Sequence, residues 1–115
     1  MSYKIRIMRL AQNDMREIFR YIADDLQNRS AAIERISLID ERILSLKENP
    51  HSVALVRYRF LASKGFRLVV VKSHLVFFVI REESKTVSVM RVLYGRRDWM
   101  RALEIEMKNT PEENS

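Results

Sequence analysis

The chain has 115 residues, a formal net charge of +6 and no cysteine, and it is 47% hydrophobic with only two glycines and two prolines. This length supports one modest hydrophobic core, and the composition excludes long disorder, a disulfide framework and thiolate chemistry. The longest apolar run, residues 75–80, is far shorter than the roughly 20 residues of a spanning helix, and the N-terminus has no secretory signal pattern. We therefore expect one cytoplasmic domain over residues 1–108, no membrane contact, and a disordered polar tail over residues 109–115.

Positive charge is concentrated in the second half of the chain. Residues 57–101 carry eleven basic and three acidic groups, whereas residues 10–48 carry six basic and eight acidic groups. Such a separation raises the potential over one face of the molecule, which favours phosphate backbones or an acidic protein as partner. The alternative is a solvated basic surface without a partner.

A strand and a helix are the first expected elements. Residues 3–10 alternate with a period of two, which predicts a strand. Asn13 or Asp14 is then a candidate helix N-cap, and Glu17 follows Asp14 by three residues, as in a capping box. An apolar stripe follows at helical spacing: Met15, Ile18, Phe19, Ile22 and Leu26.

A second helix follows the polar break at residues 27–29. Ser30 is its expected N-cap, and Asn49-Pro50 ends it. Its apolar residues recur at alternating spacings of four and three, which predicts antiparallel packing on the first helix: Ala32, Ile36, Ile39, Ile43 and Leu46. The two helices then form a helical hairpin.

The second half of the chain is typical of a sheet. We interpret residues 51–63 as a loop that could hold a short strand. Residues 66–71, 75–80 and 87–94 predict an antiparallel meander whose all-apolar middle strand is central. A last helix is expected over residues 99–108. The order β-αα-β-β-β indicates an α+β fold, with the helical hairpin packed on a mainly antiparallel four-stranded sheet.

Metal and phosphate-loop motifs are not found in the sequence. His51 and His74 have no partner at ligand spacing, and the only glycines, Gly65 and Gly95, cannot make a phosphate-cradling loop. We interpret both histidines as turn residues, and we expect no metal, no cofactor and no small-molecule substrate.

Basic residues gather around the second and fourth predicted strands. They are Arg57, Arg59, Lys64, Arg67, Arg91, Arg96, Arg97 and Arg101. Guanidinium groups bind phosphates and carboxylates with two parallel hydrogen bonds, and Tyr94 adds a stacking face with a polar end. In the corner formed by residues 94–99, Asp98 is the expected cap of the last helix and Trp99 its anchor in the core.

Three stretches of the sequence occur together in one known group of proteins. Residues 11–22 are similar to a first-helix signature of alanine, aspartate with an apolar residue, isoleucine, and tyrosine-isoleucine. Gly65-Phe66-Arg67-Leu68 is similar to an arginine-bearing second strand. Residues 89–98 are similar to a last strand that ends in an apolar pair, histidine, a small residue, arginine and aspartate, although Tyr94 replaces the histidine. This ordered set resembles the RelE/ParE superfamily, the toxin half of bacterial type II toxin–antitoxin pairs, over roughly residues 3–100.

The resemblance implies a growth-inhibiting toxin, also described as a plasmid stabilisation protein, which a cognate antitoxin neutralises with an amphipathic segment. It implies a target-binding set of Lys64, Arg67, Tyr94, Arg96 and Arg97. The ParE-like alternative, favoured by Arg96-Arg97-Asp98, is inhibition of DNA gyrase without chemistry.

The RelE-like alternative is metal-independent cleavage of mRNA on the ribosome. There, Arg67 would hold phosphate, while Arg91 and Tyr94 would complete the catalytic set. A third alternative is a non-toxic nucleic-acid-binding or adaptor module that keeps the fold.

Overall fold

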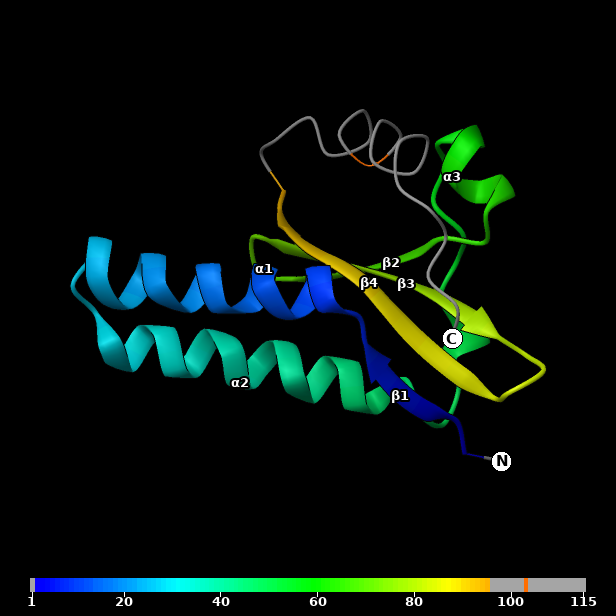
Figure 1. The fold of residues 1–115 in the computed structure, drawn as a ribbon, viewed down its shortest axis with the longest axis horizontal. Helices are drawn as coiled ribbons and strands as arrows, with labels where there is room; N and C mark the ends of the chain where they lie inside the picture. The colour runs from blue at the N-terminus through cyan, green and yellow to red at the C-terminus, as the bar shows by residue number, and fades with distance from the viewer. Residues whose placement is uncertain (1, 96–102, 104–115) are drawn as a thin grey trace.

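The structure is a computed structural model that describes residues 2–95 and residue 103. A helical hairpin lies along one face of a four-stranded sheet, and a short helix lies beyond the other face (Figure 1). The elements in chain order are β1 (Lys4–Ile7), α1 (Arg9–Arg20), a π-helical turn (Tyr21–Asp25), α2 (Arg29–Ser45), a 3₁₀ turn (Pro50–Ser52), α3 (Arg59–Ser63), β2 (Arg67–Val71), β3 (His74–Arg81) and β4 (Thr86–Tyr94). The α+β class and the order of the expected elements are confirmed.

The first strand is shorter than expected, and the helix after it begins earlier. Met8 donates its backbone N–H to Val89 at 3.0 Å, which is the last ladder bond before α1 begins at Arg9. The expected N-cap at Asn13 or Asp14 is therefore wrong, since both residues lie inside α1. Helical spacing outweighs the period of two here, because Ala11 is fully buried and Met15 packs on the same cluster.

The helical hairpin has the expected seam but different ends. Asn28, not Ser30, caps α2, because its side-chain oxygen accepts the N–H of Ala31 at 3.1 Å. The seam of α2 is confirmed: Ala32, Ile39, Ile43 and Leu46 are buried, and Ile36 packs against them. Leu26 was expected in the stripe of α1 but is 55% exposed. The π-helical turn before it changes the helical phase and explains this.

The sheet has the strand order β1-β4-β3-β2. The β2–β3 and β3–β4 pairs are antiparallel, and β1 is parallel to β4, so the meander and the central position of β3 are confirmed. Along β4, Val89 pairs with Phe78 and Arg91 pairs with Phe77, so Met90 is an extra, bulged residue. β1 covers only Thr86 to Val89, which leaves the far half of the β4 edge beside α1.

Two apolar clusters fill the two faces of the sheet. The first lies under α1 and α2 and contains Val69, Val71, Val76, Phe78, Val87, Val89 and Val92. The second lies on the opposite face and contains Val56, Leu61, Phe66, Leu75, Phe77, Val79 and Leu103. Alternate residues of each strand serve opposite clusters, which explains why β3 is apolar at both parities.

The segment interpreted as a loop, residues 51–63, contains the short helix α3, which the sequence analysis missed. Leu61 of α3 is fully buried in the second cluster, and tertiary packing therefore stabilises a helix too short to form alone. The expected short strand is reduced to a single bridge between Leu55 and Arg67. The expected last helix and the polar tail lie outside the described residues, apart from Leu103.

Candidate functional site

The described end of β4 meets the turn between β2 and β3. Tyr94, the last residue of β4, pairs with His74, the first residue of β3. Gly95 donates its N–H to the carbonyl of Ser73 at 2.8 Å. A Cβ at Gly95 would lie 3.3 Å from that same oxygen, so glycine permits this close approach. We call Arg35, Ser73, His74, Tyr94 and Gly95 the β4 corner.

His74 is the buried centre of the β4 corner, and the interpretation of it as a turn residue is wrong. Its side chain is 7% exposed, and its ring meets that of Tyr94 edge to face, with centroids 5.9 Å apart. Arg35 Nη1 lies 3.0 Å from His74 Nδ1 and donates to Ser73 Oγ at 3.2 Å. Because a guanidinium only donates, Nδ1 accepts and the ring proton is on Nε2. Burial, together with the Arg35 charge, lowers the pKa of His74.

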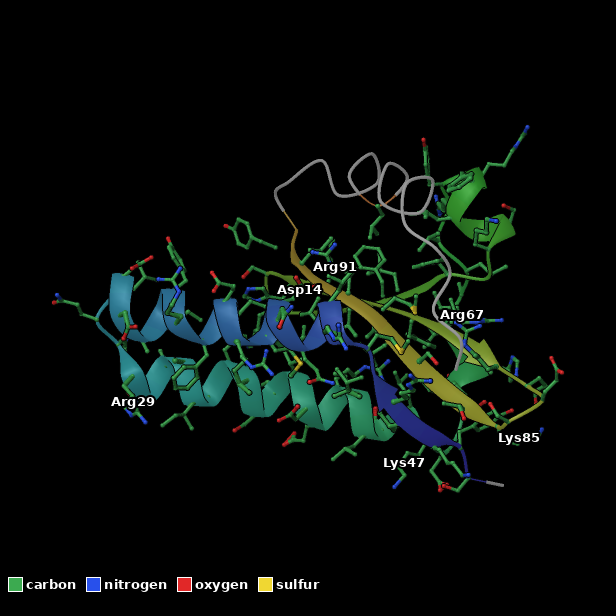
Figure 2. The ribbon with its side chains drawn as sticks, in the orientation of Figure 1. Asp14, Arg29, Lys47, Arg67, Lys85 and Arg91 are labelled. Carbon is green, nitrogen blue, oxygen red and sulfur yellow. The ribbon has the colours of Figure 1, made fainter. Side chains whose placement is uncertain are left out.

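Arg91 is held by a carboxylate of the first helix. Its Nε donates to Asp14 Oδ2 at 2.7 Å and its Nη2 donates to Asp14 Oδ1 at 2.9 Å. Asp14 Oδ2 also accepts the backbone N–H of Val92 at 2.9 Å, on the stretch of β4 that β1 does not cover. Figure 2 shows Asp14 and Arg91 together between α1 and β4. This pair links the first-helix and last-strand signatures.

Arg67 and Lys64 lie away from the β4 corner. Arg67 begins β2 and pairs with Phe78, four positions along β3 from His74, or about 13 Å at the rise of a strand. Its Nη1 donates to the carbonyl of Val53. Lys64, at the end of α3, holds its ammonium 5.9 Å from the ring centroid of Phe60. Figure 2 shows Arg67 toward the opposite end of the sheet from Arg91.

The residues of the expected nuclease set are thus not brought together. Tyr94 pairs with His74 and Arg67 pairs with Phe78, on the sheet face that α1 and α2 cover. Arg91 pairs with Phe77, which belongs to the second cluster on the opposite face. Arg96 and Arg97 lie outside the described residues. Sequence reasoning missed Arg35 and misread His74, because neighbours across a sheet cannot be paired until the register is known.

A second polar cluster lies at the turn between β3 and β4. The carboxylate of Glu82 accepts from Tyr3 Oη at 3.0 Å, lies 2.8 Å from His51 Nε2, and accepts from Lys85 Nζ at 2.5 Å. The hydrogen bonds from Lys85, His51 and Tyr3 hold the pKa of Glu82 at about 2. Among residues 2–95 and 103, no three histidine or acidic side chains are grouped as a metal ion would require.

A sequence model described as the ParE toxin of the type II toxin–antitoxin system parDE matches residues 5–99. The chain belongs to the ParE toxin family. The match begins within β1 and extends beyond Gly95 of the β4 corner. No curated protein matches the chain by sequence. Within the described part of this ParE-family chain, no helix is both long and apolar enough to cross a bilayer.

Solved structures share the fold at low sequence identity. The chromosomal ParDE system from P. aeruginosa matches with a TM-score of 0.67 at 15% identity, covering 81% of this chain and 96% of that one. A mutant of the E. coli toxin RelE in the free state matches with a TM-score of 0.64 at 11% identity, covering 93% and 98%. The toxin–antitoxin complex RelBE2 from Mycobacterium tuberculosis matches with a TM-score of 0.59 at 18% identity, covering 82% and 92%. These values establish a RelE/ParE-like fold.

Proposed function

We propose that this ParE-family toxin inhibits growth by binding DNA gyrase, and that it performs no chemistry of its own. The observation that carries this proposal is the Asp14–Arg91 pair. A guanidinium engaged by both oxygens of a carboxylate, with its side chain only 18% exposed, is poorly available to a phosphate. The separation of Arg67 from Tyr94 along the sheet also argues against a catalytic set built from these three residues.

The proposed contact surface is the end of β4 with the arginines that follow it. Tyr94 is 41% exposed and leads directly into Arg96 and Arg97. Tyrosine and arginine contribute strongly to protein interfaces, because each combines a large contact area with directional hydrogen bonding. We therefore assign target contact to Tyr94, Arg96 and Arg97, with Lys64 and Arg67 as a separate basic contribution near α3.

A specific feature favours mRNA cleavage as the second candidate. The β4 corner combines a neutral imidazole, a phenol and a guanidinium, which are groups that can transfer a proton and hold a phosphate. In this alternative His74, Tyr94 and Arg35 would replace the set expected from the sequence.

The proposed partner of the toxin is a cognate antitoxin. RelBE2 and ParDE, to which the fold is similar, are toxin–antitoxin systems. The helical hairpin offers apolar contacts for an amphipathic segment of such a partner, since Tyr21, Leu26 and Ile33 are each more than half exposed.

Controlled expression in a bacterial host tests the proposal. We expect growth arrest, relaxed plasmid DNA, and transcripts that primer extension finds intact. Codon-phased cuts with normally supercoiled plasmid would establish the nuclease instead. Unimpaired growth in a host that lacks any antitoxin would support the non-toxic module.

Two variants locate the contact surface. Arg96→Ala combined with Arg97→Ala should abolish arrest with the thermal midpoint nearly unchanged, because side chains that serve only to contact a target contribute little to folding. Tyr94→Phe should retain toxicity if the ring alone binds the target. Loss of toxicity in a folded Tyr94→Phe protein would indicate that the hydroxyl transfers a proton.

A further inference from the structure

The exposed side chain of Tyr94 is oriented by one neighbour. Tyr94 is 41% exposed at the described end of β4. Within residues 2–95 and 103 its side chain makes no hydrogen bond or ion pair, and its one ring contact is with the imidazole of His74, at a centroid distance of 5.9 Å and an interplanar angle of 62°. The direction in which Tyr94 presents its ring to solvent therefore depends on the orientation of the His74 ring.

Arg35 fixes the orientation of that imidazole from α2. Its Nη1 lies 3.0 Å from His74 Nδ1 and donates to Ser73 Oγ at 3.2 Å, so α2 is joined to the turn between β2 and β3. Because the lone pair of Nδ1 lies in the plane of the ring, this contact sets both the tautomer and the orientation of the imidazole. The backbone bond from Gly95 to Ser73 at 2.8 Å holds the end of β4 at the same turn.

The partners of Arg35 are neutral, although a guanidinium binds a carboxylate more strongly. It contacts a hydroxyl and an imidazole nitrogen, and no described carboxylate forms an ion pair with it. Among the described residues, the charged or titratable groups that interact with the His74 ring are Arg35 from α2 and Tyr94 from β4, while Val71 pairs with it from β2. Burial and the Arg35 charge both lower the pKa of His74. Arg35 thus favours the neutral ring, since a protonated one would bring two positive charges together.

We propose that Arg35 and His74 are positioning residues, which hold the ring of Tyr94 in the orientation that meets the target without binding the target themselves. The inference rests on the proposed function, in which Tyr94 is a contact residue. His74 is only 7% exposed, so it acts through Tyr94. Ordering a flexible side chain on association weakens binding by roughly two- to tenfold, and a ring that is already held avoids this loss.

Proton NMR of the free, full-length toxin tests the positioning without any target. The ring current of His74 should shift the ring signals of Tyr94, and these should change as the pH falls through the pKa of His74, because a protonated ring loses the Arg35 contact. In Arg35→Met they should move toward the signals of Tyr21, which is 52% exposed. Tyr94 signals that respond neither to pH nor to the loss of Arg35 would overturn the proposal.

A double-mutant cycle with purified DNA gyrase tests whether the effect passes through Tyr94. We expect Arg35→Met to weaken the affinity of the toxin for gyrase roughly fivefold. In a toxin that already carries Tyr94→Ala, the same substitution should have no further effect. Equal losses in both backgrounds would overturn the proposal, since Arg35 would then act independently of Tyr94.

Two further variants of α2 separate positioning from charge. Arg35→Gln keeps an N–H donor that can reach His74 Nδ1, so it should restore most of the affinity that Arg35→Met loses. Arg42→Met removes the same charge but breaks a contact with Ser45 of the same helix, and it should bind gyrase as the parent does. A loss at Arg42→Met as large as that at Arg35→Met, or no recovery in Arg35→Gln, would each overturn the proposal.

The two proposals can fail separately. A parent toxin that does not bind gyrase contradicts the proposed function alone. The NMR comparison then still decides whether Arg35 and His74 hold the Tyr94 ring, and the cycle is read from growth arrest in the bacterial host instead of gyrase affinity.

Discussion

At the scale of single residues, the Asp14 carboxylate accepts hydrogen bonds from Nε and Nη2 of Arg91 and from the backbone of Val92. Asp14 lies beside the part of β4 that β1 does not reach, so its carboxylate accepts a backbone N–H at the β4 edge that β1 does not pair. Its side chain is 13% exposed and that of Arg91 18%, so solvent screens the pair weakly.

Asp14→Ala should therefore lower the free energy of unfolding by about 2–3 kcal/mol, because it removes a carboxylate from a half-buried guanidinium and from a backbone N–H. Urea unfolding at pH 7 measures this. The matched control is Glu17→Ala on the same helix, whose pair with Arg20 is exposed and should leave the midpoint nearly unchanged. Equal effects of the two substitutions would show that the Asp14 pair has no special role.

The imidazole of His74 should be neutral at pH 7 with its proton on Nε2. Replacing Arg35 by alanine removes one of the two causes that lower its pKa, so the pKa should move toward the ordinary 6.5 but stay below it, since burial remains. An NMR titration of the ring nitrogens measures both the tautomer and the pKa. A proton on Nδ1 in the parent protein would contradict the Arg35 contact.

Glu82 should contribute to stability in a defined pH range. Its folded pKa of about 2 lies below its ordinary value of 4.5, so the contribution is complete above pH 4.5 and is lost as the pH falls toward 2. The thermal midpoint of Glu82→Gln should thus lie below that of the parent at pH 6, and the gap should narrow below pH 4.5 and close only as the pH falls through about 2. A gap that stays constant with pH would mean that charge at Glu82 does not matter.

At the scale of elements, α2 has apolar residues on two sides, of which one is buried and the other is exposed. Ile39 is fully buried in the first cluster, whereas Ile33 on the same helix is 51% exposed. Ile39→Ala should cost about 2–5 kcal/mol in unfolding free energy, because it leaves a cavity under the hairpin. Ile33→Ala, with the same change in side chain, should cost well under half of that. Similar losses at both positions would indicate that the hairpin packs with a different face.

Hydrophobic periodicity predicted the elements that bury a regular apolar stripe. It failed where contacts between residues distant in sequence determine whether an element forms and where it begins. The seam of α2 and the all-apolar β3 could be read from spacing alone, because burial of one face or of both leaves a direct pattern. The start of α1 could not, since Met8, Arg9 and Leu10 still alternate between apolar and charged residues, although on the opposite parity to Ile5 and Ile7. Helix α3 was missed because Leu61 is stabilised by a cluster gathered from β2 and β3.

The candidate site was predictable only in part, for the same reason. Tyr94 and the arginines after it stand out in the sequence, and Tyr94 does lie at an exposed strand end. The partners of Arg91 and Tyr94 are Asp14 and His74, residues 77 and 20 positions away, and only the sheet register and the position of α1 bring them together. A pattern within one element carries no information about such pairs.

At the scale of the whole molecule, the helical hairpin covers one sheet face and leaves the β4 corner accessible, with Tyr94 41% exposed. Helix α3 lies beyond the other face, and the β4 corner lies at the end of the sheet, where β4 meets the turn between β2 and β3. A toxin that acts by binding requires only that this corner and the arginines after it be accessible, whereas a nuclease also requires a reactive set within reach of one phosphate.

The most direct measurement of this account uses purified toxin with DNA gyrase and relaxed plasmid. Supercoiling should fall as toxin is added, and it should not fall when Arg96 and Arg97 of the toxin are both alanine. The Asp14→Asn toxin should inhibit supercoiling as the parent does, apart from the fraction of protein that this substitution unfolds. The same preparation should leave ribosome-bound mRNA intact. Normal supercoiling together with cleavage of that mRNA would contradict the central claim and would assign the β4 corner to catalysis.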